Sequence, residues 1–245
     1  MSAHWGGDWK MFKNLAVIPA RGGSKRIPRK NIRDFAGMPA ISRTIKFVLS
    51  TEIFSEIIVS TDDMEIAEIS LAAGATFIVN RSPLLSGDNV PTVPVISDAL
   101  KQFNHQASTK SNVCCFYPVN PFLEETNLAK GLEMLLSNSG INYVNPVVTF
   151  PYPIERALKS NSRGIVEMLN PSNLETRSQD LIDYFHDAGQ WYWGRGLTWL
   201  SEAPLLSNSM ALQVPRWVSQ DIDTIEDWKY AELLFEIQRG IRNDS

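Results

Sequence analysis

Short runs of apolar, often β-branched residues alternate with longer stretches of helical periodicity through the first 150 residues of the chain. The short runs predict strands over residues 14–18, 56–60, 76–79, 112–117 and 143–148. The periodic stretches between them predict helices over residues 39–49, 64–73, 94–103 and 128–136. Because strands and helices alternate, we expect the α/β class, as a three-layer α/β/α fold with a mostly parallel sheet.

The alternation stops near residue 150. Prolines stand at positions 151, 153 and 171, and residues 150–193 show no regular succession of strands and helices, which predicts an inserted subdomain. Strand character is predicted again over 197–200 and 216–220, and residues 224–239 read as a long amphipathic helix. The expected division is an N-terminal extension (1–13), a main domain (14–149 and 196–245) and an insertion (150–195).

Charge and composition narrow the classes of function. A net charge of -4 and a pI near 5.5 argue against a nucleic-acid partner. No apolar stretch has the roughly 18 residues of a membrane span, and the first residues lack a hydrophobic signal core, so we expect no membrane partner and a cytoplasmic protein. The two cysteines, Cys114 and Cys115, are adjacent in a predicted buried strand, which suits a reducing compartment.

The run from Ile18 to Asn31 concentrates positive charge in an otherwise acidic chain. Five cations surround Gly22, Gly23 and Ser24 directly after the first predicted strand, where open α/β sheets bind ligands. Glycines admit close backbone approach, and N–H groups beside several cations suit a polyphosphate. The alternative is a solvated basic loop. The spacing fits neither a P-loop nor a dinucleotide fingerprint.

Near the other end of the chain, Asp221 and Asp223 are separated by one residue. If residues 217–223 are extended, both carboxylates project to the same side, with Cα atoms about 6.5–7 Å apart. Mg²⁺ typically bridges one or two carboxylates to substrate phosphates, so the pair is a candidate metal site. The alternatives are that Asp223 caps the following helix, or that Thr224 and Asp227 form a capping box.

The chain resembles the CMP-sialic acid synthetases and is closest to their pseudaminic acid cytidylyltransferase branch. The resemblance covers nearly the whole chain in family order, through the segments 18–31, 81–88, 176–180, 190–194 and 221–228. It implies a nucleotide-diphospho-sugar transferase-like fold. It also implies a homodimer in which the insertion reaches across to help build the partner's sugar pocket.

The resemblance assigns CTP to the basic loop and to the segment after the third strand. The implied nucleotide-binding residues are Ala20, Arg21, Gly22, Ser24, Lys25, Lys30, Asn31, Arg81 and Ser86. Arg21 and Lys25 would hold phosphate and act in catalysis with Asp223, while Asp221 and Asp223 would hold Mg²⁺. Two alternatives stay open: Arg26 and Arg29 contact nothing, and Arg81 forms an ordinary salt bridge with Asp88.

For the sugar, Tyr117 stands where sialic acid synthetases typically carry a glutamine that touches the substrate. Tyr117 offers one hydroxyl and an aromatic face, where glutamine offers a donor and an acceptor. Asn120, Arg177, Gln179 and Tyr192 complete the implied sugar-binding set. The aromatic cluster around Tyr192 is also compatible with a core or a dimer seam.

Together with these motifs, the resemblance implies a cytidylyltransferase. The expected reaction transfers a cytidylyl group from CTP to the anomeric hydroxyl of a nine-carbon 2-keto sugar acid and releases pyrophosphate, with pseudaminic acid as the expected substrate. The alternatives within this class are N-acetylneuraminic, legionaminic and 3-deoxy-manno-octulosonic acid. Outside it stand a nicotinamide oxidoreductase, disfavoured by the missing glycine fingerprint, and a non-catalytic nucleotide-binding regulator. No side chain is identified as the general base.

Overall fold

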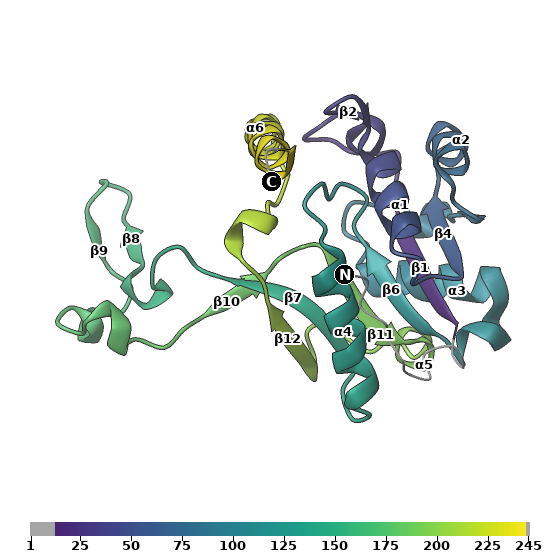
Figure 1. Cartoon of the computed structure of the whole chain (residues 1–245). Helices are drawn as coiled ribbons and strands as arrows, with labels where there is room; N and C mark the ends of the chain where they lie inside the picture. The colour runs from purple at the N-terminus through teal and green to yellow at the C-terminus, as the bar shows by residue number, and fades with distance from the viewer. Residues whose placement is uncertain (1–12, 244–245) are drawn as a thin grey trace.

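The computed structural model describes residues 13–243, with side chains to residue 240, so almost all of the expected extension 1–13 lies outside it. One eight-stranded sheet forms the centre, in the order β10-β7-β11-β6-β1-β4-β5, with β12 also paired to β7 (Figure 1). The strands are β1 (Asn14–Pro19), β4 (Glu56–Thr61), β5 (Phe77–Asn80), β6 (Asn112–Phe116), β7 (Tyr143–Thr149), β10 (Phe185–Asp187), β11 (Trp191–Arg195) and β12 (Ser209–Gln213).

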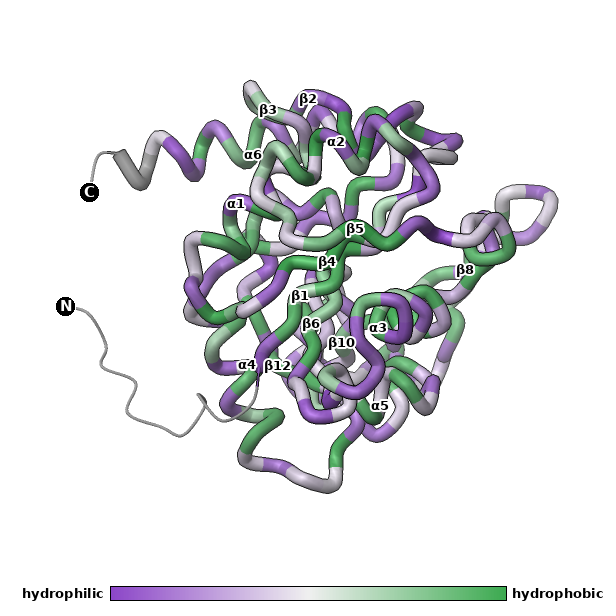
Figure 2. Tube along the Cα trace, turned by 90° about the vertical axis from the view of Figure 1, so that its right-hand side faces the viewer, coloured by the Kyte–Doolittle hydropathy of each residue, from purple (hydrophilic) through white to green (hydrophobic). Residues whose placement is uncertain are grey.

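Helices cover both faces of this sheet and bury one apolar cluster on each. The first face packs against α1 (Ala40–Ser50), α2 (Met64–Ala73), α4 (Glu125–Ser137) and α6 (Ile225–Asn243), and the second against α3 (Thr92–Ser108) and α5 (Gly196–Leu200). Side chains alternate between the faces along β1, where Ala16 and Ile18 join the first cluster and Leu15 and Val17 the second. Figure 2 shows these strands as a mostly hydrophobic centre. The expected three-layer fold is confirmed.

The direction of each strand decides which loops meet. β1 is parallel to β4 and to β6, and β4 is parallel to β5. β11 is antiparallel to both β6 and β7, so β7 runs in the same direction as β6, and β12 is parallel to β7. The carboxyl ends of β1, β4, β5, β6, β7 and β12 therefore all reach one edge of the sheet.

Two predicted strands are wrong. Residues 197–200 lie in helix α5, whose Trp199 is buried and donates its indole N–H to the carbonyl of Val113 at 3.3 Å. The 216–220 segment holds a short 3-10 helix, Arg216–Val218, and the actual strand, β12, lies just before it. β12 gives a weak sequence signal because only Leu212 of its five residues is buried.

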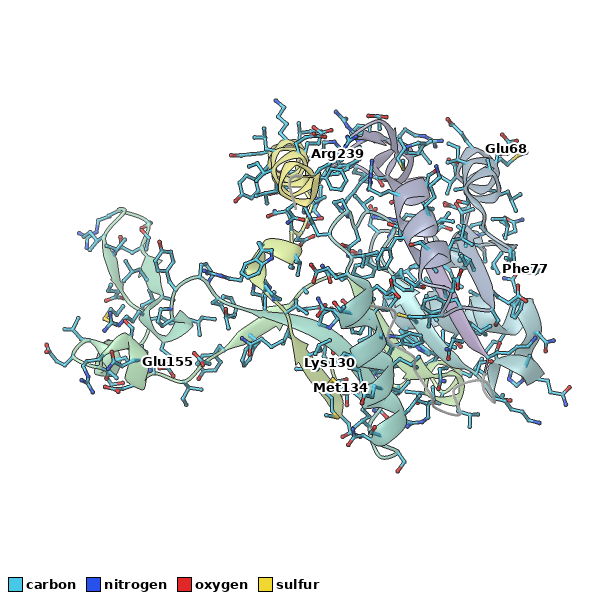
Figure 3. The ribbon with its side chains drawn as sticks, viewed as in Figure 1. Glu68, Phe77, Lys130, Met134, Glu155 and Arg239 are labelled. Atoms are coloured by element: carbon cyan, nitrogen blue, oxygen red, sulfur yellow. The ribbon has the colours of Figure 1, made fainter. Side chains whose placement is uncertain are left out.

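Residues 150–184 leave the sheet after β7 and return at β10, forming an arm that projects from the body (Figure 1). The arm contains a small hairpin, β8 (Leu158–Ser160) paired with β9 (Val166–Met168), and three short 3-10 helices. Figure 3 shows Glu155 on this arm, well away from Lys130 and Met134 of α4. At the end of the expected insertion, 150–195, β11 pairs with β6 and β7 in the central sheet, and Trp191 and Trp193 are core residues.

Candidate active site

The basic loop and the aspartate pair meet at the edge where the parallel strands end. β1 leads into residues 20–33, β5 into Arg81 and β6 into Tyr117, and β12 delivers the chain to Asp221 and Asp223. Ligands of open α/β sheets bind at this edge. Arg26 lies 2.9 Å and Lys30 3.6 Å from the carboxylate of Asp223, so two segments almost 200 positions apart in sequence share one site.

The loop is fastened to the turn after β4 and to the start of α2 by three further acidic residues. The N–H of Gly22 donates to Asp62 at 2.8 Å, and Arg29 pairs with Asp63 and Glu65. A Cβ on Gly22 would stand 2.6 Å from Asp63, whereas a Cβ on Gly23 would meet nothing within 4 Å. Position 22 therefore needs glycine so that the loop can lie against Asp63. Position 23 has room for a side chain.

The cations of the loop pair with carboxylates from other segments. Arg21 donates to Asp88 at 2.6 Å and Lys25 contacts the same carboxylate, and these two contacts hold the pKa of Asp88 below its usual value. The alternative that Arg26 and Arg29 contact nothing is wrong, because Arg26 pairs with Asp223 and Arg29 with Asp63. The charged ends of Arg21, Lys25, Arg26 and Arg29 are therefore all paired with carboxylates.

Arg81 is buried beside the loop and does not pair with Asp88, so that alternative is also wrong. Its guanidinium donates to the hydroxyl of Ser60 at 3.1 Å and to the carbonyl of Ser60 at 2.6 Å. Burial lowers the pKa of Arg81 from its ordinary value. These bonds fix the guanidinium against β4, where it lines a cavity with the basic loop.

Two adjoining cavities occupy the site. The first, of about 240 Å³, is lined by Pro19, Arg21, Ser24, Lys25, Arg26, Ile27, Lys30, Asn31, Arg81, Val90, Thr92, Val95, Tyr117, Pro118 and Asp223. The second, of about 310 Å³, is lined by Lys30, Asn31, Tyr117, Pro118, Val119, Gly189, Gln220, Asp221, Ile222 and Asp223. The basic residues are concentrated in the first, and the five lining residues common to both mark the junction.

Most of the expected nucleotide residues line the first cavity, and three do not. Ala20 is fully buried and donates its N–H to the carbonyl of Ser60 at 2.9 Å, and Gly22 acts through its bond to Asp62. Ser86 lies outside both cavities, with its hydroxyl donating to the carbonyl of Ser82 at 3.0 Å. Asn31 is buried and donates to the backbone carbonyl of Arg21 at 2.8 Å, which fixes the loop from within.

Next to the aspartate pair, the predicted capping box of Thr224 and Asp227 is confirmed. Asp221 and Asp223 themselves line the second cavity. Thr224 accepts from the N–H of Asp227 at 3.2 Å, and Asp227 accepts from the N–H of Thr224 at 2.8 Å, so these two residues cap α6. Asp223 is not needed as a cap, and its carboxylate faces the cavities with that of Asp221. Desolvation, and then the negative charge of Asp223, raise the pKa of Asp221.

The donor set of this pair fits a hard divalent cation. Two carboxylates line one cavity beside the basic loop, and oxygen atoms are what Mg²⁺ prefers. Within residues 13–243, no cluster of three or more His, Cys, Asp or Glu side chains is arranged to hold a metal ion. At this place the described residues offer two carboxylates, and a bound metal would take its remaining ligands from substrate and water.

The expected sugar-binding residues are not brought together in one chain. Tyr117 lines both cavities, whereas Tyr192 is buried beneath it in β11 and Asn120 is buried and donates to the carbonyl of Gly189 at 3.4 Å. Arg177 and Gln179 lie on the projecting arm, where Arg177 pairs with Asp180 at 2.7 Å. Their role as sugar ligands stays a prediction.

Sequence reasoning missed several residues of the site. Thr92, Gln220 and Gly189 line the cavities, and Asp62 and Asp63 hold the loop. The sequence did point to Asp62 and Asp63, because they stand directly at the end of the second predicted strand and so at the edge where such sheets bind ligands. The others carried none, since they reach the site through tertiary packing.

The comparisons with known proteins agree with this geometry. Residues 15–183 match the family model described as Cytidylyltransferase. The chain is 39% identical to the pseudaminic acid cytidylyltransferase of Campylobacter jejuni, over 92% of this chain and 97% of that protein. It is 28% identical to the CMP-N,N'-diacetyllegionaminic acid synthase of Legionella pneumophila, over 92% and 97% of the two chains.

Among solved structures, the fold is similar to that of a CMP:2-keto-3-deoxy-manno-octonic acid synthetase complexed with CTP. The TM-score is 0.66 at 16% identity, covering 92% of this chain and 99% of that one. This likeness supports the α/β/α architecture, whereas the sequence matches establish the family. The chain belongs to the cytidylyltransferase family and is a nucleotidyltransferase.

Proposed function

We propose that the chain transfers a cytidylyl group from CTP to the anomeric hydroxyl of pseudaminic acid, a nine-carbon 2-keto sugar acid, and releases pyrophosphate. The observation that carries the proposal is the junction of the two cavities, where the cations of the basic loop meet Asp221 and Asp223. The close relatives named pseudaminic acid cytidylyltransferase support the choice of sugar.

In this proposal the first cavity holds CTP and the second holds the sugar acid. Arg21 and Lys25 exchange Asp88 for phosphate oxygens, and Arg81 donates toward the cytosine carbonyl. Lys30 stands at the junction, where it faces the α-phosphate and the sugar together. The rate gain then comes from alignment of the two substrates and from fixed positive charge that stabilises the transition state.

Asp221 and Asp223 would hold Mg²⁺ in this proposal. The metal would supply charge stabilisation to the α-phosphate and the departing pyrophosphate. Binding a cation would also relieve the repulsion that contributes to the raised pKa of Asp221. Arg26 and Lys30 partly neutralise Asp223 before any cation binds.

We further propose that the protein works as a homodimer in the cytoplasm. The arm exposes apolar side chains that a second subunit would cover, among them Tyr152, Leu169, Leu174 and Ile182. An arm docked on a partner would carry Arg177 and Gln179 to that partner's sugar cavity. Buried free thiols at Cys114 and Cys115 suit a reducing compartment that also contains CTP. Within residues 13–243, no helix is long and apolar enough to cross a bilayer.

A pyrophosphate-release assay tests the function. The purified protein is incubated with CTP, Mg²⁺ and a panel of pseudaminic, N,N'-diacetyllegionaminic, N-acetylneuraminic and 3-deoxy-manno-octulosonic acids. We expect pyrophosphate release to be fastest with pseudaminic acid and to stop with EDTA. CTP binding without turnover of any sugar acid would identify a non-catalytic regulator, and thermal stabilisation by NADH but not CTP would identify an oxidoreductase.

A further inference from the structure

Gly189 lies in the short turn that joins β10 to β11, and it lines the second cavity but not the first. Its φ is +62°, in the left-handed region that glycine adopts without a steric penalty. Its N–H donates to the carboxylate of Asp187 at 3.1 Å, and its carbonyl accepts from the side-chain amide of Asn120 at 3.4 Å. Both backbone polar groups of Gly189 are therefore bonded to protein groups.

The residues on either side of Gly189 fix this turn to the rest of the domain. The N–H of Ala188 donates to the carbonyl of Pro146 in β7 at 3.0 Å. The carbonyl of Ala188 accepts from the hydroxyl of Ser219, in the segment before α6, at 3.2 Å. The carbonyl of Gln190 accepts the N–H of Tyr117 at 3.0 Å. Because three segments hold the turn, this part of the cavity wall cannot easily move back to make room for an added group.

Packing does not explain why position 189 is a glycine. A Cβ on Gly189 would meet no heavy atom within 4 Å among the described residues beyond its chain neighbours. By contrast, a Cβ on Gly194 would stand 2.8 Å from Tyr143, and one on Gly196 would stand 1.7 Å from the carbonyl oxygen of Ser108. The backbone does not demand glycine either, since asparagine also adopts left-handed φ values. The open space in front of Gly189 is therefore left for something other than protein.

We propose that Gly189 is a specificity-determining residue, whose bare surface gives the body of the sugar acid room to lie against the wall of the second cavity. The group in contact is uncharged, a face of the sugar ring or an acyl substituent. Both backbone polar groups of Gly189 are already bonded, and Pro118, Val119 and Ile222 line the same cavity. This inference rests on the proposed function, because it assigns the sugar acid to the second cavity.

Gly189→Asn tests the proposal by filling this space. Asparagine tolerates the left-handed conformation and adds a small uncharged side chain, so the turn is kept while the cavity becomes smaller. We expect the KM for the sugar acid to rise about tenfold or more, as is usual when a substrate pocket loses space. The KM for CTP should stay unchanged, because Gly189 does not line the first cavity.

Gly37→Asn is the matched control. Gly37 lies in the turn between β2 (Asp34–Phe35) and β3 (Met38–Pro39), has a φ of +88°, and lines neither cavity. Its N–H also donates to an aspartate, Asp34, at 3.1 Å, and a Cβ on it would meet no described atom within 4 Å. Gly37→Asn should leave both KM values unchanged. An equal rise of the sugar KM in both variants, or no rise in Gly189→Asn, would overturn the proposal.

A thiol-labelling experiment separates this proposal from the proposed function. Cys114 and Cys115 are both buried, so in Gly189→Cys an aromatic disulfide reagent reacts with the introduced thiol, forming a mixed disulfide and releasing an aromatic thiolate that is followed by absorbance. With CMP present to fill the first cavity, saturating pseudaminic acid should slow labelling about tenfold beyond CMP alone. Labelling of Gly37→Cys should not change.

The outcomes of this experiment and of the turnover assay are independent. Unchanged labelling of Gly189→Cys, in a protein whose wild type activates pseudaminic acid, would overturn the proposal and leave the function intact. Protection of Gly189→Cys by pseudaminic acid, together with no turnover in wild type, would support the proposal and overturn the proposed catalytic function.

Discussion

The basic loop and the arm both carry residues that the family resemblance assigns to substrate, but only the loop finds its charged partners across the fold. Arg21, Arg26 and Arg29 pair with carboxylates 34 or more positions away in sequence. Arg177 on the arm pairs with Asp180, three residues away. Solvent-exposed ion pairs add little stability, so the value of the loop contacts lies in geometry.

The comparison teaches that the two halves of the pocket are built differently. The half proposed to bind the nucleotide is assembled within one chain, because β1, β4 and β12 bring its charges to one edge. The ion pairs that the described arm residues make lie within the arm, and apolar side chains such as Leu174, 66% exposed, lie uncovered in the single chain. We infer that the sugar half reaches its final form only when a second subunit meets the arm.

Removing the carboxylate at the cavity junction should have the largest effect. Asp223→Ala is expected to lower kcat about 10³-fold or more, because it removes a proposed metal ligand and the partner of Arg26 and Lys30. Pyrophosphate release measures kcat, and circular dichroism checks the fold. Glu202→Ala, which removes the carboxylate of the surface pair with Lys101, should leave kcat unchanged. Wild-type turnover in Asp223→Ala would remove the metal assignment.

Loss of Arg21, a cation proposed to bind phosphate, should have the next largest effect. Arg21→Ala is expected to lower kcat/KM for CTP about 100-fold, as charge-assisted hydrogen bonds are among the stronger polar contacts. Lys101→Ala supplies a control, since it removes a cation remote from the cavities that pairs with Glu202 at 3.5 Å. Equal CTP dependence in Arg21→Ala and wild type would show that the loop does not bind the triphosphate.

A charge placed on the arm tests whether that region needs a partner. Leu174→Asp is expected to convert the dimer to a monomer in sedimentation experiments and to raise the KM for the sugar acid about tenfold, with the KM for CTP little changed. The matched control is Leu233→Asp on α6, which is 65% exposed and lies outside the arm. A wild-type protein that sediments as an active monomer would contradict the proposed division between the two halves.

Replacing Asp63, which anchors the basic loop through Arg29, should have the smallest effect. This effect is on the free energy of unfolding. Asp63 caps α2 by accepting the N–H of Ile66 at 3.0 Å, and the hydrogen bond from Arg29, followed by the one from Ile66, lowers the pKa of Asp63. Asp63→Ala should reduce the free energy of unfolding by about 1 kcal/mol at pH 7. Asp63→Asn, which keeps a good cap, should cost less.

The pH dependence of that effect has a definite sign. Because the folded pKa of Asp63 is depressed, its carboxylate contributes stability above the unfolded value of about 3.9 and loses that contribution as pH falls through the folded value. Urea unfolding at a series of pH values should therefore show wild type and Asp63→Asn converging in acid. A difference that stays constant down to the lowest pH would exclude the carboxylate charge as its source.

The parallel core was readable from the sequence because its strands are buried on both faces. β1, β4, β6 and β7 appear as apolar runs, and helix α2 carries an N-cap at Asp63 and a left-handed Gly74 at its end. The exposed edge strand β12 and the short helix α5 were missed, because edge position and tertiary packing override local pattern there.

The sequence by itself determined the fold class, the basic loop after the first strand and the acidic pair near the carboxyl end, because each of these is encoded in adjacent residues. Only the tertiary structure decided which charges meet: Asp88 with Arg21 and Lys25, and Asp223 with Arg26. The physical reason is that ion pairs and hydrogen bonds act over a few ångströms, and strand order and direction set which residues come within that range.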